Sequence, residues 1–265
     1  MSEASYEFAV VCEARADQLT ACGLADRVML EEIDWLTPDL LERVRRWRGA
    51  ESRSEEQFVR WQNVRQVLTH RRIPSIFGGF GEETGGPDAY ITRQALLLLA
   101  SDPNRCPDAV LLVRDSDGDL RRREGLKQAC DKPRVSRARD DTRRWPFKVV
   151  IIALAHPKRE AWVLAGFDAG NPDEEERLRT LRERLSLDPV HKSHALDARE
   201  HGAKTDIKRA LRELTRDDWE RERQCLEETP LDVLEQRGQE NGLAAFLTEV
   251  RERLVPILKG PGRPG

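Results

Sequence analysis

The sequence predicts an α/β fold in which a mostly parallel sheet is flanked by helices and followed by a mainly helical C-terminal part. Three short apolar runs have the composition and length of strands: YEFAVVC (6–12), DAVLLV (108–113) and FKVVIIAL (147–154). Continuous apolar runs of this kind are typical of strands covered on both faces. Segments with helical spacing lie between these runs, which is the order expected of βαβ units.

Two further regions of the N-terminal half are assigned from the spacing of their apolar residues. A short strand is expected near residues 27–31. Residues 38–72 carry apolar residues at helical spacing on both sides of a break near 49–54, and this pattern predicts two helices.

The rest of the chain is divided by glycine-rich and polar segments. Residues 74–88 are rich in glycine and predict a loop, and a helix should follow over 89–100 with Asp88 as its N-cap. Beyond Pro157 the pattern is helical to the end, apart from a loop near 186–203.

The length of 265 residues suits one large α/β domain or a domain with a helical appendage. We expect an α/β domain over residues 1–168, with a helical insertion at about 38–100. A helical C-terminal region should follow over 169–258, and residues 259–265 should form a disordered tail.

The composition favours a cytoplasmic protein. The five cysteines are odd in number, scattered and never spaced as C-x-x-C, which argues against a disulfide framework and against a cysteine-rich zinc site. No run approaches the roughly 18 apolar residues that a membrane span requires, and the N-terminus lacks the basic region of a signal peptide. We therefore expect no membrane partner.

The net charge of −3 conceals strong charge patterning. Residues 121–132 and 134–144 are rich in arginine and lysine, which modestly favours a nucleic-acid partner. This basic stretch is either a segment that contacts DNA or a disordered surface loop.

Acidic residues follow two of the predicted strands at the point where each strand ends. Glu13 follows the first strand, and Asp115 and Asp117 follow the strand over 108–113. Functional groups collect at the carboxyl ends of strands in parallel sheets, so we expect these carboxylates to meet. A hard divalent cation, Mg²⁺ or Mn²⁺, would neutralise them.

Each acidic feature alone is more often a solvated turn than a metal site. An EF-hand also contains an aspartate-rich loop, but this sequence does not fit one. Leu120 stands where that loop requires glycine, and Leu126 stands where it requires the closing glutamate.

Taken together, the acidic residues resemble the Toprim domain. The pattern is a strand ending in Glu13 with Asp17 four residues later, and a later strand ending in Asp115 and Asp117. Topoisomerases, bacterial primases and the overcoming-lysogenization-defect nucleases share this domain. The resemblance covers about residues 6–165.

A second resemblance concerns HPKREAWVLAGF, residues 156–167. It is similar to the E-A-W helix of Toprim-like bacterial proteins found in phage-defence loci. The resemblance implies that Glu160 lies on a helix with Trp162, Val163 and Phe167 on its buried side. Glu160 is then a further metal ligand or a residue that orients the ligands, and otherwise a surface residue.

The same group tends to carry basic residues later in the chain. Lys204 and Lys208 are four residues apart, and Thr205 or Asp206 is expected to cap the helix that carries them. Lysines on one helix face near its N-terminus suit a phosphate group. A solvated basic face is the alternative.

These resemblances imply a nuclease that depends on Mg²⁺ or Mn²⁺ and cleaves phosphodiester bonds, with DNA favoured over RNA. It would be the effector of a bacterial anti-phage defence system, beside a partner ATPase of the ABC or AAA class, since the chain carries no P-loop of its own. A homo-oligomer is possible. The implied metal ligands are Glu13, Asp115, Asp117, Asp119 and Glu160, and the implied catalytic residues are Glu13, Asp115, Asp117 and Lys204.

The alternative is a Toprim fold that acts as a non-catalytic interaction or regulatory subunit of an ATPase complex. Ala14 supports this alternative, because many Toprim proteins have glycine after the first glutamate. A zinc site at His191, His194 and His201 is disfavoured, since no cysteine or suitably spaced acid completes the ligand set. Strand passage and primase activity are disfavoured by the lack of a suitably placed tyrosine and of a zinc ribbon.

Overall fold

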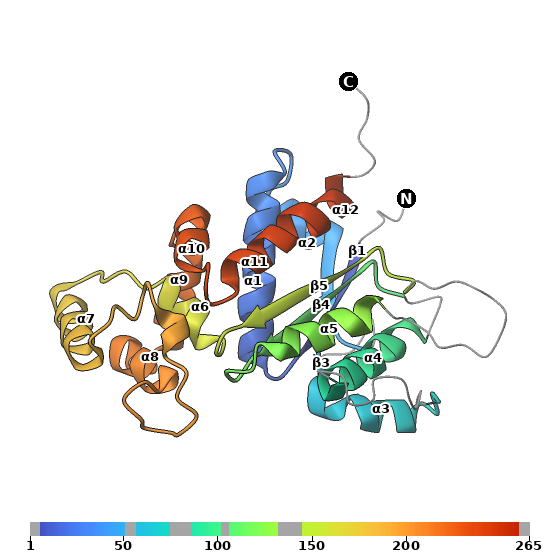
Figure 1. Cartoon of the computed structure of the whole chain (residues 1–265). Helices are drawn as coiled ribbons and strands as arrows, with labels where there is room; N and C mark the ends of the chain where they lie inside the picture. The colour runs from blue at the N-terminus through green and yellow to red at the C-terminus, as the bar shows by residue number, and fades with distance from the viewer. Residues whose placement is uncertain (1–5, 51–56, 75–85, 102–105, 132–144, 260–265) are drawn as a thin grey trace.

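The computed structural model, shown in Figure 1, describes residues 6–50, 57–74, 86–101, 106–131 and 145–259. It confirms an α/β fold built on a parallel sheet. The strand order is β2-β1-β4-β5, with β3 also paired to β1, and every pairing among these strands is parallel. The strands are β1 (Tyr6–Cys12), β2 (Arg45–Arg48), β3 (Val59–Arg60), β4 (Ala109–Asp115) and β5 (Val149–Ala155).

Helices cover both faces of the sheet. On one face, α1 packs against β1 and β4 while α11 packs against β5; on the other, α3, α4 and α5 form a layer (Figure 1). The helices of the N-terminal half are α1 (Arg15–Glu32), α2 (Pro38–Val44), α3 (Val64–His70), α4 (Gly86–Ala100), α5 (Arg121–Asp131) and α6 (Glu160–Ala165). Those of the C-terminal part are α7 (Pro172–Leu185), α8 (Ile207–Thr215), α9 (Trp219–Glu227), α10 (Leu231–Arg237), α11 (Leu243–Glu249) and α12 (Val255–Lys259).

The central strands send alternate side chains into two separate cores. In β1, Phe8, Val10 and Cys12 join the core under α1 and the C-terminal helices, whereas Ala9 and Val11 join the core under α3, α4 and α5. Successive side chains of a strand point to opposite faces, so both faces of β1 are buried. This explains why the strand is continuously apolar.

The three predicted principal strands are confirmed: β1 has the predicted ends, and the ends of β4 and β5 are shifted by one or two residues. The strand expected near 27–31 is wrong, because these residues belong to α1. Val28 and Met29 continue a buried helical stripe that begins with Ala21, Leu24 and Ala25. Residues 27–31 look like a strand only when the buried helical stripe that precedes them is ignored.

The prediction of two helices over 38–72 is partly wrong. Only α2 and α3 are α-helical, and residues 45–48 form β2, which pairs with β1. Trp47 explains the change, because its ring packs against Phe8 and its Nε1 donates to Asp26 at 3.1 Å. Pairing with an existing strand has outweighed helical spacing, so the insertion at 38–100 is not purely helical.

Two other local predictions are corrected. Helix α4 begins at Gly86, so Asp88 lies in its first turn instead of capping it, and Asp88 pairs with Arg114 at 2.9 Å. The basic residues 121–131 form α5 and not a surface loop. The rest of the basic stretch, 132–144, and most of the glycine-rich loop, 75–85, lie outside the described residues.

The predicted helical C-terminal part is confirmed, as is the loop near 186–203, which holds one short 3-10 helix, η3 (Ser193–Ala195). The α11 side chain of Glu249 accepts from the Ile152 backbone N of β5 at 3.1 Å. A short π-helical segment, η4 (Val250–Leu254), follows α11 and contacts α1. The predicted tail falls outside the described residues except for Lys259.

Within the described part of the chain, no helix is both long enough and apolar enough to cross a membrane.

Candidate functional site

The sheet brings acidic side chains of separate segments to one edge. β1 and β4 are neighbours, so Glu13, after β1, and Asp115, at the end of β4, lie at the same edge. β5 is the next strand, and the chain leads from it into α6, which begins with Glu160. We call Glu13, Asp17, Asp115, Asp117 and Glu160 the acidic cluster.

Asp17 joins this cluster from the first turn of α1. Its carboxylate accepts from the Ala14 backbone N at 2.9 Å, which satisfies an amide at the helix start. Burial raises the pKa of Asp17; the Ala14 hydrogen bond and Arg159 lower it, and Glu160 raises it. Ala14 itself has extended backbone with φ of −144°, so alanine fits here without strain.

Asp115 is the electrostatic centre of the cluster. Burial raises its pKa to about 8, and the negative charges of Asp17, Glu160 and Glu13 add to the rise. A hydrogen bond from the Arg159 backbone N to Asp115 Oδ1, 2.9 Å long, acts in the opposite direction. Three carboxylates, two at the start of α1 and one from α6, therefore act on one buried aspartate, which is the environment that a cation stabilises.

The loop after β4 is tied to the loop after β5. The Asp117 backbone N donates to the Pro157 carbonyl at 2.9 Å, and Ser116 Oγ lies 2.8 Å from His156 Nδ1. Asp117 and Gly118 both have positive φ, 46° and 78°, a conformation that aspartate and glycine tolerate well. These contacts fix the backbone position of Asp117.

Two arginines of α5 form ion pairs with two aspartates of this loop. Arg122 Nη1 donates to Asp117 Oδ2 at 2.8 Å and to the Asp115 carbonyl at 2.7 Å. Asp119 binds Arg121 through both carboxylate oxygens, each at 2.8 Å, and this hydrogen bonding lowers the pKa of Asp119 to about 2. Asp119 is thus held by its neighbour Arg121 and does not join the cluster.

Glu160 points inward, and Lys208 lies near it. The E-A-W helix is confirmed as α6, with Trp162, Val163 and Phe167 buried. The Glu160 side chain is 13% exposed, and its Oε1 lies 3.8 Å from Lys208 Nζ. This long ion pair brings a cation of α8 to the cluster.

The predicted placement of the two lysines is corrected. Asp206 caps α8, as predicted, and accepts from the Lys208 backbone N at 3.0 Å. Lys204 lies before this cap, so the two lysines do not share a helix face. The Lys204 side chain is exposed, and its carbonyl accepts from Arg184.

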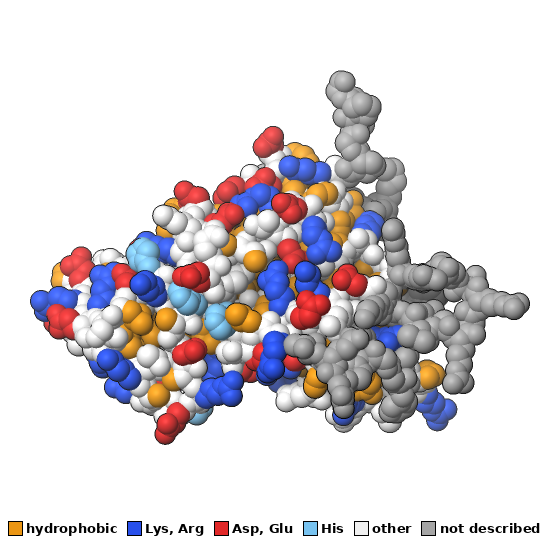
Figure 2. All heavy atoms as spheres, in the orientation of Figure 1, with side chains coloured by type: hydrophobic (Ala, Val, Ile, Leu, Met, Phe, Trp, Pro, Cys, Tyr) orange, Lys and Arg blue, Asp and Glu red, His pale blue; other side chains and the backbone are white. Residues whose placement is uncertain are grey.

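Two hollows reach the cluster, and basic side chains line both. One, of about 500 Å³, includes Glu13 together with Arg65 and Arg114. The other, of about 510 Å³, includes Asp117 together with Arg122 and other basic residues of the loops around it. Figure 2 shows lysine and arginine side chains interspersed with acidic ones over the face it presents. Arginine and lysine side chains around a group of carboxylates can bind the phosphates of a nucleic-acid backbone beside the acidic cluster.

Glu13 stands at the mouth of the first hollow. Partial burial raises the pKa of its carboxyl group, Arg114 lowers it, and Asp117 raises it again. Arg114 lies over the Trp61 ring at 5.2 Å, and the Trp61 indole donates to the Val113 carbonyl at 2.7 Å. The arginine is therefore held in place by an aromatic ring that is itself anchored to β4.

The donor set has the right chemistry for Mg²⁺ or Mn²⁺, since carboxylate oxygens are their preferred protein ligands. The ligands are not preassembled, however: among the described residues, no three His, Cys, Asp or Glu side chains converge enough to hold a metal ion as they stand. Asp117 is paired with Arg122, and one Asp115 oxygen accepts from Arg159. Metal binding would require Asp117 to exchange its arginine for the cation.

Sequence reasoning missed three contributors to this site. Asp17 was part of the motif but was not assigned as a site residue, although its place four residues after Glu13 on a helix was a usable signal. Arg122, through its side chain, and Arg159, through its backbone N, reach the aspartates by tertiary contacts that no local pattern marks. Lys208 was considered together with Lys204, and the structure places Lys208 beside Glu160.

Comparison of the chain with protein-family models, with curated proteins and with solved structures gives no match, so the Toprim resemblance stays a prediction carried by the residues quoted above.

Proposed function

We propose that this protein is a nuclease that depends on Mg²⁺ or Mn²⁺ and hydrolyses phosphodiester bonds. The observation that carries the proposal is Asp115, whose pKa is raised to about 8 by burial and by three neighbouring carboxylates. Strongly perturbed carboxylates at the carboxyl ends of parallel strands are typical of functional sites.

Glu13, Asp115 and Asp117 would hold the ion, with Glu160 as a further ligand; Asp119, which Arg121 already binds through both carboxylate oxygens, would not. When bound, such an ion lowers the pKa of a bound water and stabilises the negative charge that develops on phosphate.

The basic residues around the cluster supply the remaining chemistry. Arg65 and Arg114, which line the hollow at Glu13, would bind the phosphates of the substrate backbone. Lys208, beside Glu160, would neutralise charge on the scissile phosphate. We assign this role to Lys208 in preference to Lys204, because Lys208 is the lysine that pairs with a member of the cluster.

The biological setting follows from the resemblance. An effector of anti-phage defence that acts on DNA beside an ABC- or AAA-class ATPase would explain a nuclease centre in a chain without a P-loop. A local basic helix, α5, at the side of the site supports a nucleic-acid partner.

One observation favours the second candidate, a non-catalytic regulatory subunit. Arg122 and the Arg159 backbone N already bind the two central aspartates, and such pairing would also stabilise a site that binds no metal. In that case the cluster would be a structural element of an interaction module.

The test combines metal binding with cleavage. Calorimetry with Mn²⁺ and cleavage of plasmid DNA and of total RNA are compared for the wild type, Asp115→Asn and Asp34→Asn. Asp34, in the exposed turn after α1, is the matched control because the same change removes one charge away from the cluster.

The proposed function predicts Mn²⁺ binding and metal-dependent cleavage in the wild type and in Asp34→Asn. Asp115→Asn should lose at least about 100-fold in kcat and weaken Mn²⁺ binding, because the central ligand is neutral. A wild type that neither binds Mn²⁺ nor cleaves either polymer would favour the regulatory subunit.

A further inference from the structure

Arg159 connects the acidic cluster to the C-terminal helices. Its backbone N donates to Asp115 Oδ1 at 2.9 Å, while its guanidinium contacts α9 and α1. Arg159 Nη2 pairs with Glu222 of α9 at 2.8 Å, and Nη1 lies 3.5 Å from Thr20 Oγ1 of α1. The guanidinium also lies 5.6 Å from the centre of the Trp219 ring. Arg159 therefore contacts the acidic cluster through its backbone and contacts α9 through its side chain.

The pair with Glu222 is shielded from water. The side chains of Arg159 and Glu222 are 12% and 14% exposed, whereas Arg223 of α9 forms its ion pairs with Glu220 and Glu227 in solvent. A shielded pair is held more firmly than a surface pair, and removal of one partner leaves a charge without compensation. Trp219 closes over the guanidinium and adds a cation–π contact.

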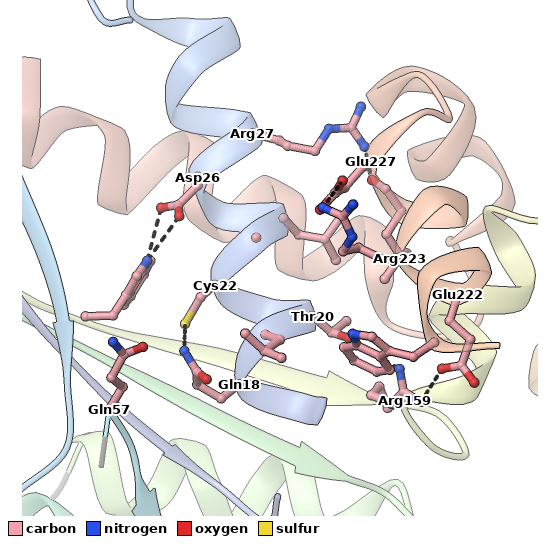
Figure 3. A pocket seen from close by; sticks show the side chains of 16 residues that line it. Gln18, Thr20, Cys22, Asp26, Arg27, Gln57, Arg159, Glu222, Arg223 and Glu227 are labelled. Carbon is pink, nitrogen blue, oxygen red and sulfur yellow. Dashed lines mark hydrogen bonds and ion pairs between the residues drawn. The ribbon is translucent and has the colours of Figure 1, made fainter. Parts of the chain in front are cut away.

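The surroundings of the pair leave room for its side chains to move. Figure 3 shows Arg159 and Glu222 joined by their hydrogen bond at the wall of a hollow, with Thr20 beside them. This hollow has a volume of about 380 Å³, and Trp219 also lines it. A shorter or neutral side chain can therefore be accommodated there without crowding.

We infer that Arg159, Glu222 and Trp219 form a latch through which α9 sets the position of Asp115. Arg159 is a positioning residue: its side chain anchors the 156–160 segment to α9, and its backbone N then holds one oxygen of Asp115 in place. Supporting groups of this kind orient ligands and commonly change metal affinity about 10- to 100-fold when they are removed. The expected effects on metal affinity and on kcat rest on the proposed function, whereas the latch itself rests only on the contacts of Arg159.

The test uses the full-length chain and three readouts: amide hydrogen exchange of the 113–119 and 156–161 segments without metal, Mn²⁺ affinity, and kcat and KM on a nucleic-acid substrate. Glu222→Gln is the main variant, and Trp219→Leu is the second. Glu220→Gln is the matched control, because Glu220 lies on the same helix and pairs with Arg223 in solvent.

We expect Glu222→Gln to exchange at least about threefold faster in both segments, with thermal unfolding still cooperative. Its Mn²⁺ affinity should fall about 10-fold and its kcat should fall with it, while KM for the substrate changes little. Glu220→Gln should match the wild type. In an Arg159→Met background, Glu222→Gln should have no further effect, since the latch is already open.

The outcomes separate this inference from the proposed function. Unchanged exchange in 113–119 with Glu222→Gln and Trp219→Leu would overturn the latch, as would full additivity with Arg159→Met. Faster exchange in both segments of a protein that binds no Mn²⁺ would support the latch and overturn the metal-dependent function instead.

Discussion

At the scale of single residues, Asp115 makes the stability of the fold depend on pH. Its pKa rises from 3.8 to about 8 on folding, so the folded state keeps a proton that the unfolded state has lost. The stabilisation is complete below about pH 4 and is lost as the pH rises toward 8. Asp26 behaves in the same direction with a pKa of about 6, so Asp115 is the residue whose raised pKa extends the loss of stability to about pH 8.

We therefore expect the metal-free protein to lose stability between pH 6 and pH 8. In Asp115→Asn this slope should flatten, and the free energy of unfolding at pH 8 should rise by about 1–3 kcal/mol. Urea unfolding at a series of pH values in a chelator measures both. Asp34→Asn serves as the control, and pH curves of equal slope for Asp115→Asn and the wild type would contradict the raised pKa.

A second residue-scale prediction concerns the two lysines. Lys208→Met should lower kcat about 100-fold, because it removes the cation that pairs with Glu160 and would face the scissile phosphate. Lys204→Met should lower it far less, since Lys204 lies before the cap of α8. Steady-state cleavage kinetics of both variants decide the assignment, and a larger loss in Lys204→Met would reverse it.

At the scale of elements, the approach of α6 to α9 depends on one glycine. A Cβ atom on Gly166 would lie 2.0 Å from the Cys225 carbonyl oxygen of α9, which is backbone and cannot rotate away. Thr229 Oγ1 also donates to the Gly166 carbonyl at 2.7 Å, so the contact holds both segments. The close packing of these two helices also brings α9 near Arg159.

Gly166→Ala should therefore destabilise the protein by more than about 2 kcal/mol, because α6 and α9 must separate. Gly23→Ala in α1 is the matched control, since a Cβ there meets nothing within 4 Å. That change should stabilise the protein by up to about 1 kcal/mol through helix propensity. Thermal and urea unfolding of both variants give the comparison; equal stability of the two would refute the close-contact argument.

The elements that the sequence predicted well are those whose buried residues form an unbroken apolar run or stripe in the sequence. β1, β4 and β5 are apolar on both faces, and α6 carries its buried side in the residues around E-A-W. β2 could not be predicted, because residues 45–48 include three arginines and become a strand only by pairing with β1. α5 shows the same limit, since its buried residues are few and stand in a strongly basic run.

At the scale of the whole molecule, the candidate site depends on strand order more than on any single motif. Sequence position suggested that Glu13 and Asp115 would meet, and the neighbouring places of β1 and β4 confirm that they share one sheet edge. The arginines that bind the aspartates come from α5 and from the loop before α6. Their roles could not be predicted, because nothing local indicates which of 45 basic residues contacts the cluster through its side chain, as Arg122 does, or through its backbone, as Arg159 does.

The sheet and the C-terminal helices also share one core. Buried residues from Phe8 of β1 to Leu258 of α12 form a single hydrophobic cluster, and Glu249 of α11 accepts from the backbone of β5. Together, α11 and η4 cover the face of β5 that α5 does not. The predicted boundary at residue 168 therefore runs through a continuous core, so the two parts should not be stable separately.

A fragment of residues 1–168 should accordingly fail to fold cooperatively. It would expose the apolar side of α1 and one face of the sheet, and each fully exposed large side chain costs about 1.5–3 kcal/mol of burial, against a typical total stability of about 5–15 kcal/mol. Near-ultraviolet circular dichroism and dispersion of amide NMR signals measure the outcome. A 1–259 fragment is the matched control and should melt like the full chain, because it keeps all the helices and strands given above and the core that they share. Well-dispersed spectra from residues 1–168 would instead show that the α/β part is an independent domain, and Asp115 could then be positioned without α9.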